Sequence, residues 1–283
     1  MKSTQQLAGL LLIALASSSC FAQPSQRERA LAVTAALHAE GQRHEVEGLT
    51  LWIEPDGLDE NCVQQFVVQL QQGLAVVREY LGDLQDDPET GPRVEVFMSP
   101  GVGISHVRYD APTMLYMPTW RIRDRTAPYL HEFVHAVASW SWRHSEWLGE
   151  GLANHVATAV EPISGGYHHS NVVPDRLLDV HRHLDSLEGR EVLALIGPTG
   201  RRRELPPDLE AINQKVLTDR TRYARPFYAL SWSFVDFIVA RKGLANLRVV
   251  SADPVEIARL KRLWLAQLRA EAEASGRDAQ HLP

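Results

Sequence analysis

His131-Glu132-Phe133-Val134-His135 is the stretch that constrains the fold most. On a helix, His131 and His135 lie one turn apart, so both imidazoles project from the same face and can reach one metal ion. Glu132 lies about 100° around the helix axis, where its carboxylate can hold a water molecule without occupying a ligand position. The stretch therefore predicts a metal-binding helix, and its apolar neighbours indicate that this helix lies at the bottom of a cleft.

A second stretch, Trp147-Leu148-Gly149-Glu150-Gly151-Leu152-Ala153, supplies a third ligand. Residues 136–149 separate Glu150 from His135, which is enough chain to finish one helix, turn and begin another. Two imidazoles, one carboxylate and an open position for water are the usual composition of a catalytic zinc site, whereas structural zinc sites more often use thiolates. The chain has only two cysteines. We therefore expect one catalytic Zn²⁺ per chain, bound by His131, His135 and Glu150.

Together, the two stretches resemble the gluzincin zinc metallopeptidases, in particular the aminopeptidase-like (peptidase MA-like) group. That group pairs His-Glu-x-x-His with a downstream Trp-x-x-Glu-Gly-x-Ala, and this chain has both motifs in that order within residues 129–157. A weaker similarity covers residues 228–237. The resemblance implies zinc ligands at His131, His135 and Glu150, Glu132 as the general base, and a zincin-like fold.

The exact peptidase activity stays open. Aminopeptidases of this group bind the free amine through a Gly-x-Met-x-Asn loop before the active-site helix, and the sequence has no such stretch. An endopeptidase or a narrow hydrolase of the cell envelope is therefore an equal alternative to an aminopeptidase. In each case we expect a peptide or protein substrate, attacked by zinc-activated water with Glu132 as the proton acceptor.

A tyrosine is expected to donate to the oxyanion that forms during hydrolysis, as one does in related peptidases. Tyr228 and Tyr223 are the candidates, and Tyr228 is preferred because it follows Pro226 in the first turn of a predicted helix. The alternative is that Tyr228 is merely packed among its apolar neighbours. Asn154, one turn after Glu150, either hydrogen-bonds a ligating imidazole or is a solvated residue.

Composition excludes several other classes of protein. The chain has 283 residues, a net charge of −6, 45% hydrophobic residues and 23% charged residues, which is typical of a folded globular protein. It offers no basic field for a phosphate backbone, so no nucleic-acid partner is expected. The main alternative to an enzyme is a catalytically silent binding or assembly protein of the cell envelope that keeps the peptidase fold. Glu132 argues against it, because a site without turnover has no need of that residue.

Residues 1–22 are typical of a secretory signal peptide. Lys2 precedes an apolar run over residues 7–16, and small residues follow. The run is too short to cross a bilayer of about 30 Å, so no transmembrane segment is expected. Cleavage after Ala22 predicts a periplasmic or secreted protein. The alternative is a lipid anchor at Cys20, as in bacterial lipoproteins.

The remaining chain predicts a polar, loosely held leader (23–45), a single zincin-like domain (46–275) and a flexible tail (276–283). Periodicity of two predicts strands at 44–54, 93–98 and 113–117, with a Gly-rich loop at 101–110. Strand 113–117, the nearest upstream of the active-site helix, is the candidate edge for binding an extended peptide. Helical periodicity predicts helices at 58–81, 126–141, 146–160, 174–187, 205–217, 226–242 and 253–274. The fold class is α+β: a small mixed β-sheet followed by a mainly helical body.

Overall fold

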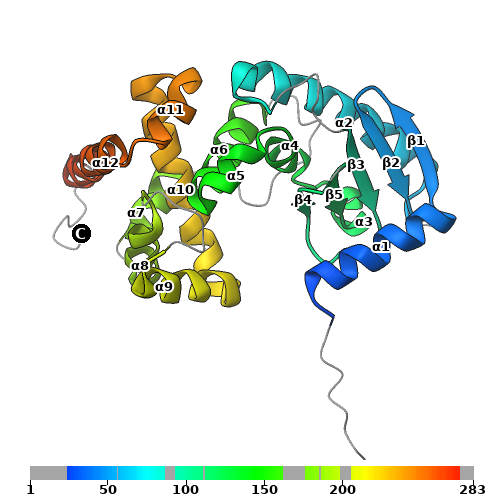
Figure 1. Cartoon of the computed structure of the whole chain (residues 1–283), viewed down its shortest axis with the longest axis horizontal. Helices are drawn as coiled ribbons and strands as arrows, with labels where there is room; N and C mark the ends of the chain where they lie inside the picture. Colours follow the sequence, from blue (N-terminus) through cyan, green and yellow to red (C-terminus); the bar gives the residue numbers. More distant parts are fainter. Residues whose placement is uncertain are drawn as a thin grey trace, which may run out of the picture.

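The computed structural model describes residues 24–55, 57–86, 93–110, 112–161, 176–184, 186–197 and 205–274. The predicted signal peptide at 1–22, the alternative lipid anchor at Cys20 and the predicted tail at 276–283 lie outside these residues. Within the described residues the structure is a small mixed sheet combined with many helices (Figure 1), in agreement with the predicted mixture of α and β structure.

The sheet has five strands in the described part of the chain, in the order β1-β2-β3-β5-β4. The central pairs β2–β3 and β3–β5 are parallel, and the outer pairs β1–β2 and β5–β4 are antiparallel. In the central register, Val94 pairs with both Leu49 and Thr113. The strands are β1 (Gln42–Val46), β2 (Leu49–Ile53), β3 (Val94–Met98), β4 (His106–Arg108) and β5 (Thr113–Met117).

Three details of the sheet differ from the sequence predictions. The predicted strand 44–54 is a hairpin, because Glu47 and Gly48 form a two-residue turn in which Gly48 takes a φ of +76°. The predicted loop at 101–110 contains β4, which at three residues is too short to produce a recognisable alternation. Because β4 pairs with β5, β4 is the edge strand, and the prediction of an edge at Thr113–Met117 is wrong.

Helices cover both faces of the sheet. Helix α2 (Glu60–Leu81) buries Phe66, Leu70 and Val77 in the main core, together with alternate residues of β2, β3 and β5. Helix α1 (Gln26–Glu40) lies across the other face (Figure 1), where Ala30 and Leu37 join a smaller core cluster. The segment predicted to be a loosely held leader is therefore mostly a helix packed on the sheet. Its two buried side chains are too few to give a strong periodic signal.

The helical body begins after the sheet and carries the two motifs. Helix α4 (Tyr129–Val137) and helix α6 (Glu146–Ala159) are separated by the short helix α5 (Ser139–His144). The single helix predicted at 126–141 is thus broken at Ala138. The loop residue Asp86 explains the break, because its backbone N–H donates to Val137 O at 2.7 Å and its carboxylate accepts from Ser139 N at 2.8 Å. These two bonds satisfy the backbone carbonyl at the end of α4 and the backbone N–H at the start of α5, so the chain stops one helix at Ala138 and begins another.

The later helices pack around α10, which is the longest of them and itself packs against α6. The described helices of this part are α7 (Arg176–Leu184), α8 (Leu187–Leu195), α9 (Pro207–Thr218), α10 (Arg220–Lys242), α11 (Leu247–Ser251) and α12 (Pro254–Ala274), and α3 (Thr119–Arg123) precedes α4. Helix α10 begins earlier than predicted, because Asp219 accepts a hydrogen bond from Arg222 N and caps the helix. Pro226 therefore lies inside α10, and the placement of Tyr228 in a first turn is wrong.

None of the helices in the described ranges combines the length and apolar character needed to cross a membrane.

Candidate metal centre

Helix α4 holds the first motif in a buried position between α2 and α6. All nine of its residues are buried. Tyr129 packs edge-on against Phe66 of α2, with ring centres 5.7 Å apart. Gly73 of α2 allows this close approach, since a side chain there would overlap the Tyr129 ring. The apolar residues of α4 thus fix the helix, and His131, Glu132 and His135 reach the cleft from it.

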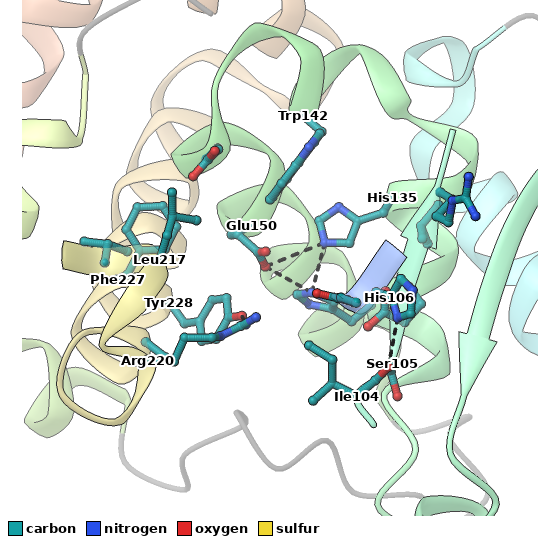
Figure 2. Close-up of a pocket in the computed structure, with 18 of the residues that line it drawn as sticks. Ile104, Ser105, His106, His135, Trp142, Glu150, Leu217, Arg220, Phe227 and Tyr228 are labelled. Carbon is teal, nitrogen blue, oxygen red and sulfur yellow. Dashed lines mark hydrogen bonds and ion pairs between the residues drawn. The ribbon is translucent and has the colours of Figure 1, made fainter. Parts of the chain in front are cut away.

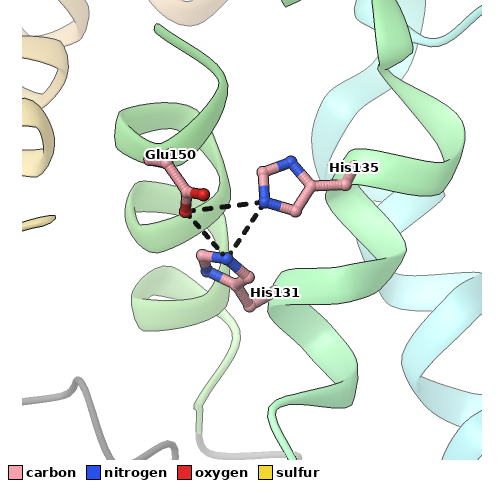
Figure 3. A group of neighbouring side chains, drawn as sticks. All are labelled: His131, His135 and Glu150. Carbon is pink, nitrogen blue, oxygen red and sulfur yellow. Dashed lines mark hydrogen bonds and ion pairs between the residues drawn. The ribbon is translucent and has the colours of Figure 1, made fainter. Parts of the chain in front are cut away.

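The structure brings together the three predicted ligands. His131 Nε2 lies 3.0 Å from His135 Nε2 and 3.1 Å from Glu150 Oε2, and His135 Nε2 lies 3.6 Å from the same Glu150 oxygen (Figure 3). The three side chains are buried, with 5 to 8% of each residue exposed. We call them the metal triad. Two of its members come from one turn of α4 and the third from the first half of α6.

The metal triad can hold a metal ion. Four ligands at about 2.05 Å around a tetrahedral ion lie about 3.3 Å from one another, and the observed separations of 3.0 to 3.6 Å bracket that value. Glu150 Oε2 is buried without a hydrogen bond of acceptable angle, although both imidazole nitrogens face it. A buried carboxylate oxygen in that position is costly unless something positive satisfies it. The donor set therefore fits a cation.

Asn154 orients the first ligand. Its Oδ1 accepts a hydrogen bond from His131 Nδ1 at 3.0 Å, and both side chains are buried. Because Nδ1 carries the proton, the neutral imidazole presents the lone pair of Nε2 to the other two ligands. Of the two alternatives for Asn154, the structure selects the hydrogen bond to a ligating imidazole.

The Glu150 carboxylate of the triad and the neighbouring Glu132 carboxylate differ in basicity. Burial raises the pKa of Glu132 above its ordinary value, although the neighbouring His131 and His135 oppose that rise. Burial also acts to raise the pKa of Glu150, but its contacts with the same two histidines outweigh this effect and hold the pKa well below its usual range. Glu150 is thus the ionised carboxylate of the triad, and Glu132 is the more basic group that lines the cleft beside it.

Tyr228 lines the cleft and Tyr223 does not. The Tyr228 ring centre lies 6.4 Å from that of His131, and its hydroxyl accepts a hydrogen bond from Arg220 at 2.7 Å (Figure 2). Burial is the main reason that the pKa of Tyr228 is raised, so the hydroxyl keeps its proton at neutral pH. The hydroxyl of Tyr223 donates instead to Glu191 of α8. Between the two candidates, only Tyr228 is near the triad.

The cleft has a volume of about 550 Å³ and lies between the edge strand β4 and the junction of α9 with α10. Sequence reasoning missed Tyr109, which follows β4, and Arg220 of α10, and Trp142 of α5 also lines the cleft. Trp142 packs edge-on against His135, with ring centres 5.4 Å apart. Burial is the main reason that the pKa of Tyr109 is raised, and Glu150 and Glu132 add to the rise. No sequence motif marks these residues, since the cleft walls come from segments far apart in the chain.

The residues and the geometry of the cleft are the basis for interpreting the function of this chain. The metal triad, Glu132 and Tyr228 line one cleft. Comparisons of the chain with protein-family models, with curated proteins and with solved structures found no match.

Proposed function

We propose that the protein is an exported zinc-dependent hydrolase of gluzincin type that cleaves peptide bonds. The observation that carries the proposal is the convergence of His131, His135 and Glu150 on one point beside Glu132, in an open cleft. Two imidazoles and one carboxylate suit Zn²⁺, and an open side suits a catalytic rather than a structural site. The signal-peptide pattern of residues 1–22 supports export to the periplasm or the cell exterior.

The chain supplies two groups that can move or hold protons during hydrolysis. Zinc, when bound, activates water and polarises the carbonyl of the bond that is cut. The Glu132 carboxylate would accept a proton from the attacking water and pass it to the departing amine. The Tyr228 hydroxyl, from the same cleft, would donate to the carbonyl oxygen as negative charge develops there.

A metal analysis tests the zinc site. We expect one zinc per chain in the purified wild-type protein by elemental mass spectrometry, and weak or no binding in Glu150→Ala. Glu79→Gln, on the exposed face of α2, is the control and is expected to bind zinc like the wild type. A wild-type protein that binds no zinc after zinc is supplied would exclude the proposal.

Replacing the proton acceptor tests the hydrolysis. Glu132→Gln is expected to bind zinc normally and to hydrolyse a broad peptide library roughly 10²- to 10⁴-fold more slowly than the wild type. The same measurement separates the enzyme from a catalytically silent binding protein. A Glu132→Gln variant as active as the wild type would show that the hydrolysis does not use this site.

A further inference from the structure

One wall of the cleft is apolar except for the exposed Arg220 and the hydroxyl of Tyr228. The end of α9 and the first turns of α10 form this wall, which faces the segment around β4 across the metal triad (Figure 2). Its cleft-lining residues are Val216, Leu217, Arg220, Ala224, Phe227 and Tyr228. In Figure 2 the guanidinium of Arg220 points toward the triad, alongside Tyr228.

Arg220 has no carboxylate partner among the described residues. Its polar contact is the Tyr228 hydroxyl, which uses one of the five N–H donors of a guanidinium. Two other arginines near the cleft are paired: Arg222 of the same helix with Glu188, and Arg108 of the opposite wall with Asp110 at 2.6 Å. A guanidinium beside apolar side chains, with donors left over, is well suited to bind a carboxylate through two parallel hydrogen bonds.

Arg220 is also close to the place where a substrate would be cut. It lies 2.7 Å from the Tyr228 hydroxyl, and the Tyr228 ring centre lies 6.4 Å from that of His131. Successive residues of a peptide are about 3.8 Å apart. A peptide whose cleaved bond lies at the triad therefore brings a group one or two residues away within reach of Arg220.

We propose that Arg220 binds a carboxylate of the substrate, carried within one or two residues of the bond that is cut. This proposal rests on the proposed hydrolase function and restricts its substrates to peptides that carry such a carboxylate. The carboxylate has two possible sources, the free C-terminus of a short peptide or chain end, and an acidic side chain. Arg27 of α1, which also lines the cleft and has no carboxylate partner among the described residues, adds positive charge to the same space.

A binding experiment with matched peptides tests the proposal without relying on turnover. The zinc-loaded Glu132→Gln protein is titrated calorimetrically with N-acetylated tripeptides that end in leucine, as free acid and as C-terminal amide. A second, amidated pair carries glutamate or glutamine at one internal position. We expect the carboxylate member of at least one pair to bind about 10- to 100-fold more tightly than its neutral partner. The pair that shows the preference identifies the source of the carboxylate.

Variants on the same Glu132→Gln background assign the preference to Arg220. Arg220→Gln is expected to remove it, and Arg220→Lys to keep only part of it, because lysine cannot form the bidentate contact. Arg222→Gln, the same change on the same helix at a residue paired with Glu188, is the matched control and should keep the preference. Tyr228→Phe should also keep it, which separates carboxylate binding from a role of Arg220 in positioning Tyr228.

The outcomes distinguish this proposal from the proposed function. Peptides that bind through Arg220 but are never cleaved by the wild type would overturn the hydrolase and leave the carboxylate site standing. Peptides that the wild type cleaves, but whose carboxylate and neutral forms bind equally well, would overturn the carboxylate site and leave the hydrolase standing. The Arg220 proposal is overturned if neither pair shows a preference at millimolar peptide concentration, or if the preference survives Arg220→Gln.

Discussion

Asn154 accepts a hydrogen bond from His131 at 3.0 Å, and both side chains are buried. The bond does two things for the ligand: it selects the tautomer whose Nε2 is free to bind a metal, and it fixes the plane of the ring. Partners of this kind usually matter for metal affinity almost as much as the ligands themselves. The contribution of Asn154 can therefore be measured separately from that of the triad.

Asn154→Ala is expected to weaken zinc binding about 10- to 100-fold while leaving the fold intact, because only the orientation of His131 is lost. Competition with a fluorescent zinc chelator gives the affinity, and far-ultraviolet circular dichroism checks the fold. Thr158→Ala, one turn further along α6 and only half-buried, is the control. Equal affinities of Asn154→Ala and wild type would mean that the hydrogen bond does not hold the ligand.

Among single residues, the sequence predicted those that belong to a recognisable local pattern. His131 and His135 are one helical turn apart, and Glu150 has a distinctive set of neighbours, so a local pattern was sufficient. Arg220 could not be found in this way. It is one of three arginines between residues 220 and 225, and only the packing of α10 on α6 decides which of them faces the cleft.

Helices α6 and α10 pack closely beside the site, and a glycine makes that possible. A Cβ at Gly151 would lie 2.5 Å from both Ser231 O and Val235 Cγ2 of α10. The backbone of α6 therefore touches α10 directly, one residue after the ligand Glu150. This contact sets the distance between the ligand on α6 and the wall that carries Arg220 and Tyr228.

Gly151→Ala is expected to lower the free energy of unfolding by about 1–3 kcal/mol, because α6 and α10 must separate to admit the methyl group. The shift should also displace Glu150 and weaken zinc binding. Urea unfolding followed by circular dichroism measures the stability. Gly103→Ala, where an added Cβ meets nothing within 4 Å, is the control and should be close to neutral. A Gly151→Ala protein as stable as the control would contradict this packing.

Among the elements, the sequence predicted those with a long regular pattern. The apolar face of α2 and the boundaries of α6 agree with prediction within a few residues, because each helix buries one continuous stripe. The break at Ala138 and the early start of α10 depend on capping contacts from one residue each, Asp86 and Asp219. The edge strand β4 exists because β5 offers it hydrogen-bonding partners. Contacts of this kind leave no periodic trace in the sequence.

For the molecule as a whole, the metal triad joins two helices that belong to different layers. Helix α4 packs against α2 and lies near the sheet, whereas α6 packs against α10. The two helices also pack against each other. An ion shared by the two helices would therefore tie the sheet side of the protein to its helical side. Its free energy of binding would add to the stability of both.

Removal of the metal is therefore expected to lower the melting temperature of the wild type. An ion present at about 100 times its Kd stabilises a protein by about 2.7 kcal/mol, which corresponds to roughly 5–10 °C for a chain of this size. Thermal scans with zinc and with a chelator measure the difference. Glu150→Ala is the control, and its melting temperature should be the same in both conditions. If the wild type melts at the same temperature with zinc and with the chelator, the ion does not bind the folded protein strongly.

The three residues of the metal triad lie within residues 131–150, and this short separation affects how an ion enters and leaves. The chain loops that an ion would close run only from residue 131 to 135 and from 135 to 150, and the packing of α4 and α6 already closes them. Little loop-closure entropy is left for the ion to offset. The protein is thus expected to give up its ion and take it back at equilibrium while it stays folded. Metal supply in its surroundings, rather than refolding, would then set the fraction of molecules that carry an ion.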